Sequence, residues 1–199
     1  MEKIVDYYFA PVSPYAYLGH DRFAALAARH RVRVAVKPIN LGEVFPVSGG
    51  LPLAKRAPQR QAYRMVELKR WAAFLGKPMQ FQPQHFPVSG DLAAAVIVAV
   101  GLLDASRALA VAGAVGKAVW EQQRNIADAT TLSTIVDECG ASGAVVMERA
   151  QASEVAAHLG ALTQEAIGRG VFGAPTYVYR DELFWGQDRL DFLDRALAQ

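Results

Sequence analysis

The chain has 199 residues, of which 52% are hydrophobic and 20% charged, so it can bury a full core as one domain or as one domain with an insertion. The 21 basic and 19 acidic residues leave a formal charge of +2 with no long run of either sign, which gives no indication of nucleic-acid binding. The longest apolar stretch, residues 92–103, is too short to cross a bilayer, which needs about 20 residues, so we expect no membrane segment.

The first elements predict a β-α-β unit. Residues 4–9 are rich in β-branched and aromatic side chains, which are typical of a buried strand. Ser13 and Pro14 then predict a helix start, because serine caps a free amide and proline fits the first helical position. This helix is expected to end near His30, and residues 32–37 alternate with a period of two, as in a strand. A connection through one helix makes the two strands parallel.

The middle of the chain is predicted to be helical after an irregular start. Proline and glycine recur between residues 40 and 58, which predicts an irregular surface segment of the kind that often binds ligands. Helical spacing then predicts a helix from Gln61 that stops at Gly76. Further helices are expected over residues 91–104, 107–124, 131–139 and 153–168.

The last part of the chain predicts an antiparallel hairpin of residues 176–180 and 183–185, followed by a helix from Gln187. The order is therefore βαβ, a long helical stretch, and αββα. This order predicts an α/β fold with a thioredoxin-like core, formed by residues 1–43 and 153–199 and split by an all-helical insertion of residues 44–152.

Two distant segments stand out as candidates for a functional site. Ser13 lies where the amides of a helix start favour anions, including a thiolate, by roughly 0.3–1 kcal/mol at an exposed site. On local sequence alone, Ser13 is a helix cap and no more. Pro175 opens the strand at residue 176, and in a thioredoxin-like fold this proline is usually cis and faces the first helix. We therefore expect a cis Ala174–Pro175 bond rather than a trans proline at a strand edge, with the Ala174 backbone free to pair with a peptide-like ligand.

Four segments carry a resemblance that runs nearly end to end: residues 13–18 (SPYAYL), 68–72 (LKRWA), 171–176 (VFGAPT) and 185–190 (WGQDRL). Together they resemble the 2-hydroxychromene-2-carboxylate isomerases, a family related to the kappa-class glutathione transferases and to periplasmic disulfide-forming oxidoreductases. The resemblance implies a thioredoxin fold with a helical insert. In the oxidoreductases two cysteines bracket the helix start, whereas this chain has the residues SPYA there, which excludes disulfide exchange.

The resemblance implies glutathione as a cofactor that is not consumed, and it assigns residues to the tripeptide. Ser13 would lie beside the sulfur and act as a hydrogen-bond donor rather than as a nucleophile. The Ala174 backbone and Pro175 would face the cysteinyl unit. Gln187 and Asp188 would hold the γ-glutamyl end, although capping of the last helix explains these two residues as well.

Four basic residues cluster where the predicted insertion begins: Lys55, Arg56, Arg60 and Arg64. Arg60 stands where relatives have a lysine, and the resemblance implies that it pairs with a glutathione carboxylate. We expect the other three to form a solvated basic face. Family asparagines are replaced at Gly50 and Ser89.

Aromatic side chains are expected to line the pocket for the second substrate, a small aromatic carboxylate by the same resemblance. The expected residues are Tyr15, Phe86 and Trp185. Core packing explains most aromatic positions equally well. Tyr15 and Trp185 are the two positions that we expect to line the pocket rather than the core.

The reaction implied by the resemblance interconverts 2-hydroxychromene-2-carboxylate and trans-o-hydroxybenzylidenepyruvate in aromatic catabolism. Two alternatives stay open: a glutathione transferase or peroxidase that acts on another electrophile, and a non-catalytic thioredoxin-like binding module. A homodimer is expected by analogy with the family.

Other patterns do not point to a different chemistry. Residues 168–173 (GRGVFG) match a dinucleotide glycine pattern, but they follow a helix and lead into a strand, the reverse of the required context. The four histidines lack metal-ligand spacing, so no metal site is expected. Cys139 is the only cysteine, so one chain forms no disulfide, and a cytoplasmic location is the simplest inference.

Overall fold

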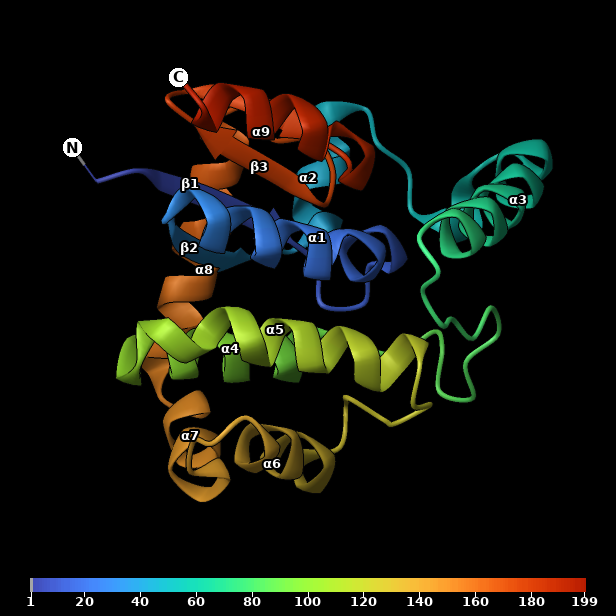
Figure 1. Ribbon diagram of the computed structural model, residues 1–199. Helices are drawn as coiled ribbons and strands as arrows, with labels where there is room; N and C mark the ends of the chain where they lie inside the picture. The colour runs from blue at the N-terminus through green and yellow to red at the C-terminus, as the bar shows by residue number, and fades with distance from the viewer. Residues whose placement is uncertain (1) are drawn as a thin grey trace.

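The computed structural model describes residues 2–199 and contains a four-stranded sheet surrounded by helices (Figure 1). The strands have the order β2-β1-β3-β4, with bounds β1 (Ile4–Phe9), β2 (Arg33–Pro38), β3 (Thr176–Tyr179) and β4 (Glu182–Trp185). β1 pairs in parallel with β2 and antiparallel with β3, and β3 pairs antiparallel with β4. The predicted β-α-β unit and the C-terminal hairpin are therefore confirmed.

The helices of the described chain are α1 (Pro14–His30), α2 (Leu41–Ser48), α3 (Pro58–Phe74), α4 (Asp91–Leu103), α5 (Ala105–Trp120), α6 (Ala129–Glu138), α7 (Gly143–Ala150), α8 (Ser153–Gly168) and α9 (Leu190–Leu197), with short 3-10 turns η1 (Leu53–Lys55) and η2 (Gln187–Arg189). In Figure 1, α4 and α5 lie between the sheet with α1 and the pair α6 and α7, whereas α3 lies apart at the right. The segment from α2 to α8 interrupts the sheet between β2 and β3, as predicted; the division into two domains stays a prediction. Among residues 2–199, no helix combines the length and the apolarity needed to span a membrane.

Side chains alternate along β1 between the two faces of the sheet, and both faces are buried. On one face, Tyr7 stacks on Tyr177 with ring centroids 5.3 Å apart, and Phe23 of α1 packs against both rings. On the other face, Tyr8 and Val178 belong to a second buried cluster that includes residues of α2 and α8. The sheet therefore holds α1 rigidly at the end of β1, where the candidate site begins.

The prediction of an irregular segment over residues 40–58 is wrong for its first part, which forms α2. The side chain of Asn40 caps this helix by accepting a hydrogen bond from the amide of Gly42 at 2.9 Å, and Val44 is fully buried against the core. Pro46 lies inside the helix, which ends soon afterwards at Gly49 with a φ of 76°. Proline and glycine therefore shorten this helix rather than prevent it.

Three further differences concern individual helices. The sequence predicts no helix over residues 143–150, where α7 begins behind the capping side chain of Ser142. α6 begins before Thr131, because the carboxylate of Asp128 accepts a hydrogen bond from the Thr131 amide at 2.7 Å. The last helix begins with the 3-10 turn η2 at Gln187 and continues as α9. These differences leave the topology unchanged.

Candidate functional site

Ser13 lies in the turn between β1 and α1, and its side chain caps the helix. Its φ of −74° and ψ of 120° are non-helical, and its Oγ accepts a hydrogen bond from the amide of Ala16 at 3.2 Å. Pro14 occupies the first helical position, so the predicted cap is confirmed. Because the Oγ accepts this bond, the hydroxyl proton is available for donation to a second group.

One amide in the first turn of α1 has no partner among residues 2–199. Pro14 has no N–H, the Ala16 amide donates to Ser13, and the Tyr17 amide donates to the Ser13 carbonyl at 3.1 Å. The amide of Tyr15 remains, at the positive end of the helix dipole. The Ser13 hydroxyl and the Tyr15 amide are therefore two donors for an anion at one turn.

The Ala174–Pro175 bond is cis, as expected from the fold. Because β1 and β3 are antiparallel, the start of β3 lies beside the end of β1, with Thr176 opposite Tyr8. This pairing places the Ala174–Pro175 segment and Ser13 at the same end of the two central strands. Neither the amide nor the carbonyl of Ala174 has a hydrogen-bond partner within the described chain, whereas the carbonyl of Pro175 accepts from the Gly186 amide at 2.9 Å. The Ala174 backbone can therefore still pair with a ligand.

The turn after β4 is anchored to α1 by Arg22. Gly186 has a φ of 105°, a backbone conformation that other residues rarely adopt. Gln187 is 2% exposed, and both its side-chain Oε1 and its carbonyl accept from Nη1 of Arg22 at 3.3 Å. Asp188 lies nearer the surface and pairs with Arg189 at 2.7 Å. The Gln187 side chain is thus part of the scaffold, while the Asp188 carboxylate is presented beside it.

These segments surround one pocket of about 530 Å³, a volume within the usual range for small-ligand sites. Most of the residues expected at a functional site line it: Tyr15, Arg60, Ala174, Trp185, Gln187 and Asp188. Ser13 and Pro175 do not line it themselves, although Tyr15 and Ala174, which lie two residues and one residue away along the chain, do. The opposite wall is formed by α3, which also contributes Tyr63, Arg64, Glu67 and Trp71.

Three guanidinium groups line this pocket without a carboxylate partner in the described part of the chain: Arg56, Arg60 and Arg64. Lys55 is exposed, as expected for a solvated basic face, whereas Arg56 and Arg64 are partly buried and line the pocket. Arg64 is half-buried, and this burial lowers the pKa of its guanidinium. Arg60 and Arg64 are one turn apart on α3, and Arg56 precedes that helix. That they face a pocket follows only from the presence of the distant Tyr15 in the same lining.

The expected aromatic residues do not all meet at the pocket. Tyr15 and Trp185 line it, and burial raises the pKa of the Tyr15 hydroxyl against the opposing effect of the Arg64 guanidinium. Phe86 does not line it; its ring packs against Trp120 with centroids 4.8 Å apart, as a core residue does. Trp71, which core packing explains equally well from sequence, supplies a further aromatic surface of the pocket.

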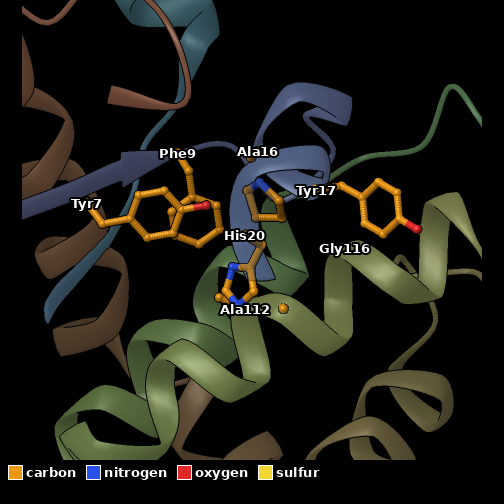
Figure 2. Close-up of a pocket in the computed structure, with 9 residues that line it drawn as sticks. Tyr7, Phe9, Ala16, Tyr17, His20, Ala112 and Gly116 are labelled. Atoms are coloured by element: carbon orange, nitrogen blue, oxygen red, sulfur yellow. The ribbon is translucent and has the colours of Figure 1, made fainter. Parts of the chain in front are cut away.

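Two other spaces lie close to the Ser13 turn. A groove of about 480 Å³ borders Pro11 and Val12 on the side of α2, α4 and α8. A small enclosed cavity of about 10 Å³ lies between β1, α1 and α5, and in Figure 2 the rings of Tyr7 and His20 turn toward it while the Tyr17 ring points away. This cavity has room for about one water molecule, so it does not compete with the larger pocket as a ligand site.

Comparison with known proteins gives consistent results over the full length. The DsbA-like thioredoxin domain model matches residues 4–198. A 2-hydroxychromene-2-carboxylate isomerase of Sphingobium xenophagum is 30% identical over 99% of both chains, and glutathione S-transferase kappa 1 of Caenorhabditis elegans is 24% identical over 98% of this chain and 91% of that one. Among solved structures, a 2-hydroxychromene-2-carboxylate isomerase superposes with a TM-score of 0.82 at 26% identity, covering 98% of this chain and 94% of the other. The chain therefore belongs to the DsbA-like thioredoxin family and, within it, to the 2-hydroxychromene-2-carboxylate isomerases.

Proposed function

We propose that this protein is a glutathione-dependent isomerase that interconverts 2-hydroxychromene-2-carboxylate and trans-o-hydroxybenzylidenepyruvate, or a close analogue. The observation that carries the proposal is the pair of free donors at the Ser13 turn, because Tyr15 of this turn and Ala174, whose backbone is unpaired, line the same pocket. The names of the relatives support an isomerase, and the kappa-class relative supports the use of glutathione.

The pocket fits glutathione in size and in polarity. Its volume of about 530 Å³ suits a tripeptide, and the free amide and carbonyl of Ala174 match the backbone groups of a cysteinyl unit. Asp188 offers a carboxylate for the ammonium group, and the exposed Arg60 offers a guanidinium for a carboxylate. The donor set therefore matches a zwitterionic peptide better than an apolar ligand.

Bound glutathione would supply a thiol that adds reversibly to the conjugated substrate, so that a double bond gains the freedom to rotate. The contribution of the protein is to favour thiolate over thiol, since a free thiol has a pKa of about 8.5. The Ser13 hydroxyl and the Tyr15 amide are both free donors in the same turn, at the positive end of α1. A hydrogen bond to a charged group and a helix terminus together correspond to a lowering of the thiol pKa by about one to two units.

The proposal is tested by Ser13→Ala, with Ser13→Thr as the variant that keeps a hydroxyl. We expect Ser13→Ala to lower isomerase turnover at least tenfold and to raise the pKa of the bound thiol by about one unit, measured by the ultraviolet absorbance of the thiolate. Ser142→Ala is the control, because Ser142 caps α7 in the same way and its loss affects only stability. Unchanged turnover in Ser13→Ala would contradict the proposal.

A second candidate function is a glutathione transferase or peroxidase that acts on another electrophile, and the kappa-class relative is the observation that favours it. Stoichiometric loss of glutathione during turnover would select this candidate, because an isomerase leaves the glutathione concentration unchanged. The homodimer stays a prediction.

A further inference from the structure

Arg64 is a partly buried cation without a counter-ion. Its side chain is half-buried in the wall of the pocket, and its one hydrogen bond within residues 2–199 joins Nη1 to the weak acceptor Sδ of Met65 at 3.9 Å. A guanidinium held away from water without a carboxylate is unfavourable unless an anion neutralises it. Neither of the two acidic side chains of the pocket pairs with Arg64, since Glu67 lies 3.0 Å from Arg70 and Asp188 lies 2.7 Å from Arg189.

The position of Arg64 beside Tyr15 distinguishes it from Arg60. Arg64 and Tyr15 line the same pocket, and the charge of the Arg64 guanidinium opposes the burial that raises the pKa of the Tyr15 hydroxyl. Tyr15 follows Ser13 by two residues at the start of α1. Arg60 lies one helical turn earlier in α3 and is exposed. The carboxylates of glutathione are at the two ends of the tripeptide and its thiol is in the middle. A cation that shares the pocket with Tyr15, next to the Ser13 turn, is therefore suited to the molecule that the thiol attacks.

We propose that Arg64, together with the Tyr15 hydroxyl, binds the carboxylate of the aromatic substrate, whereas Arg60 serves glutathione. This inference rests on the proposed function and adds a recognition site for the second substrate. The guanidinium presents a planar pair of donors that matches a carboxylate, and Tyr15 adds a third donor.

The walls next to Arg64 suit an aromatic ring. Trp71 lies two helical turns further along α3 and lines the same pocket, as do Tyr63 and Trp185. Aromatic side chains of this kind stack on, or meet edge-on, an aromatic ligand. A substrate whose carboxylate is bound by Arg64 would therefore place its aromatic ring between α3 and the turn after β4.

The test measures binding rather than turnover and uses trans-2-hydroxycinnamate and its methyl ester, which differ in the negative charge. In the full-length protein with saturating glutathione, tryptophan fluorescence reports each titration, since Trp71 and Trp185 line the pocket. We expect the carboxylate to bind roughly 10- to 100-fold more tightly than the ester. Arg64→Gln should abolish this preference, and Arg64→Lys should retain part of it.

Two matched variants separate the roles along α3. Arg60→Gln should weaken glutathione binding and keep the preference for the carboxylate over the ester. Lys69→Gln removes an exposed charge outside the pocket, so it should change neither the affinity for glutathione nor this preference. The inference is overturned if Arg64→Gln keeps the preference, or if its main effect is weaker glutathione binding. Wild-type protein that binds no glutathione would instead contradict the proposed function, which the glutathione titrations report separately.

Discussion

Gly173 allows the indole of Trp185 to pack directly over the segment that precedes Pro175. A Cβ atom at position 173 would lie 2.5 Å from Nε1 of Trp185, well inside van der Waals contact. The indole is held on its other side by Phe172, with ring centroids 4.7 Å apart. The pocket wall at Ala174 and Trp185 therefore depends on the absence of a side chain at one position.

Gly173→Ala is expected to weaken glutathione binding about tenfold with little loss of stability. The indole is 51% exposed, so it can swing outward to relieve the contact, and the pocket wall changes while the core does not. Isothermal titration with glutathione and thermal unfolding measure the two effects. Gly160→Ala is the control, because Gly160 is an exposed position of α8 where a Cβ meets nothing within 4 Å. That variant should gain about 0.5–1 kcal/mol of stability and keep its affinity for glutathione.

Arg22→Met should raise the dissociation constant for glutathione about tenfold, although Arg22 does not line the pocket. Arg22 holds Gln187 through two hydrogen bonds at 3.3 Å and pairs with Asp191 at 3.1 Å, so its loss frees the turn that presents Asp188. Arg29→Met is the matched control, since Arg29 also joins α1 to α9, through Asp194, but does not contact the turn. Equal affinities for glutathione in the two variants would refute the positioning role of Arg22.

His20 should make the protein less stable as the pH falls from 6.5 toward 4. Burial lowers the pKa of His20 to about 4 from an ordinary value of 6.5, and the nearby carboxylate of Asp21 only partly opposes this. Between these values the unfolded chain takes up a proton that the folded protein does not. The contribution is therefore complete above pH 6.5 and is lost toward pH 4, by up to about 3 kcal/mol.

The measurement for His20 is urea unfolding of the wild type and of His20→Gln across this pH range. The difference in the free energy of unfolding between the two proteins should shrink by up to about 3 kcal/mol as the pH falls. His158→Gln, at an exposed histidine, is the control. Parallel curves for the wild type and His20→Gln would show that His20 does not titrate in this way.

Lys37→Met is expected to destabilise the protein by about 1–3 kcal/mol at neutral pH. Lys37 pairs with Asp6 at 2.9 Å and with Glu165 at 2.6 Å, and the Lys37 and Asp6 side chains are only 15% and 18% exposed. Removing the ammonium leaves two carboxylates close together with only Arg169 between them. Arg33 lies on β2, as Lys37 does, and forms an exposed pair with Glu2. Arg33→Met should therefore change stability by less than about 0.5 kcal/mol. Denaturant unfolding compares the two.

The sequence predicts the sheet, its connections and the cap at Ser13 correctly, because these depend on local patterns. Alternation and helical spacing identify β1, α1 and β2, and serine before proline identifies the helix start. The cis bond before Pro175 is different, since no local pattern requires it and only the inferred topology predicts it. The segment 40–58 misled the prediction, because the cap at Asn40 and the burial of Val44 outweigh the glycine and proline content.

The composition of the pocket was only partly predictable. Arg56, Arg60 and Arg64 share one face of a helical pattern, but a pattern alone cannot tell whether that face meets water or another segment. The partner here is Tyr15, which lies far away in sequence. Phe86 illustrates the opposite case, since an aromatic residue beside a family motif packs on Trp120 within the core.

The central place of β1 in the sheet has a consequence for incomplete chains. β1 and β2 pair within the first 38 residues, but the other edge of β1 has no neighbour until β3 is synthesised near the end of the chain. A product that terminates before residue 176 would keep Ser13 and most helices, yet it would expose the backbone of a hydrophobic strand. Two such fragments can join through these edges, so premature termination would produce aggregating material and not a partly active enzyme.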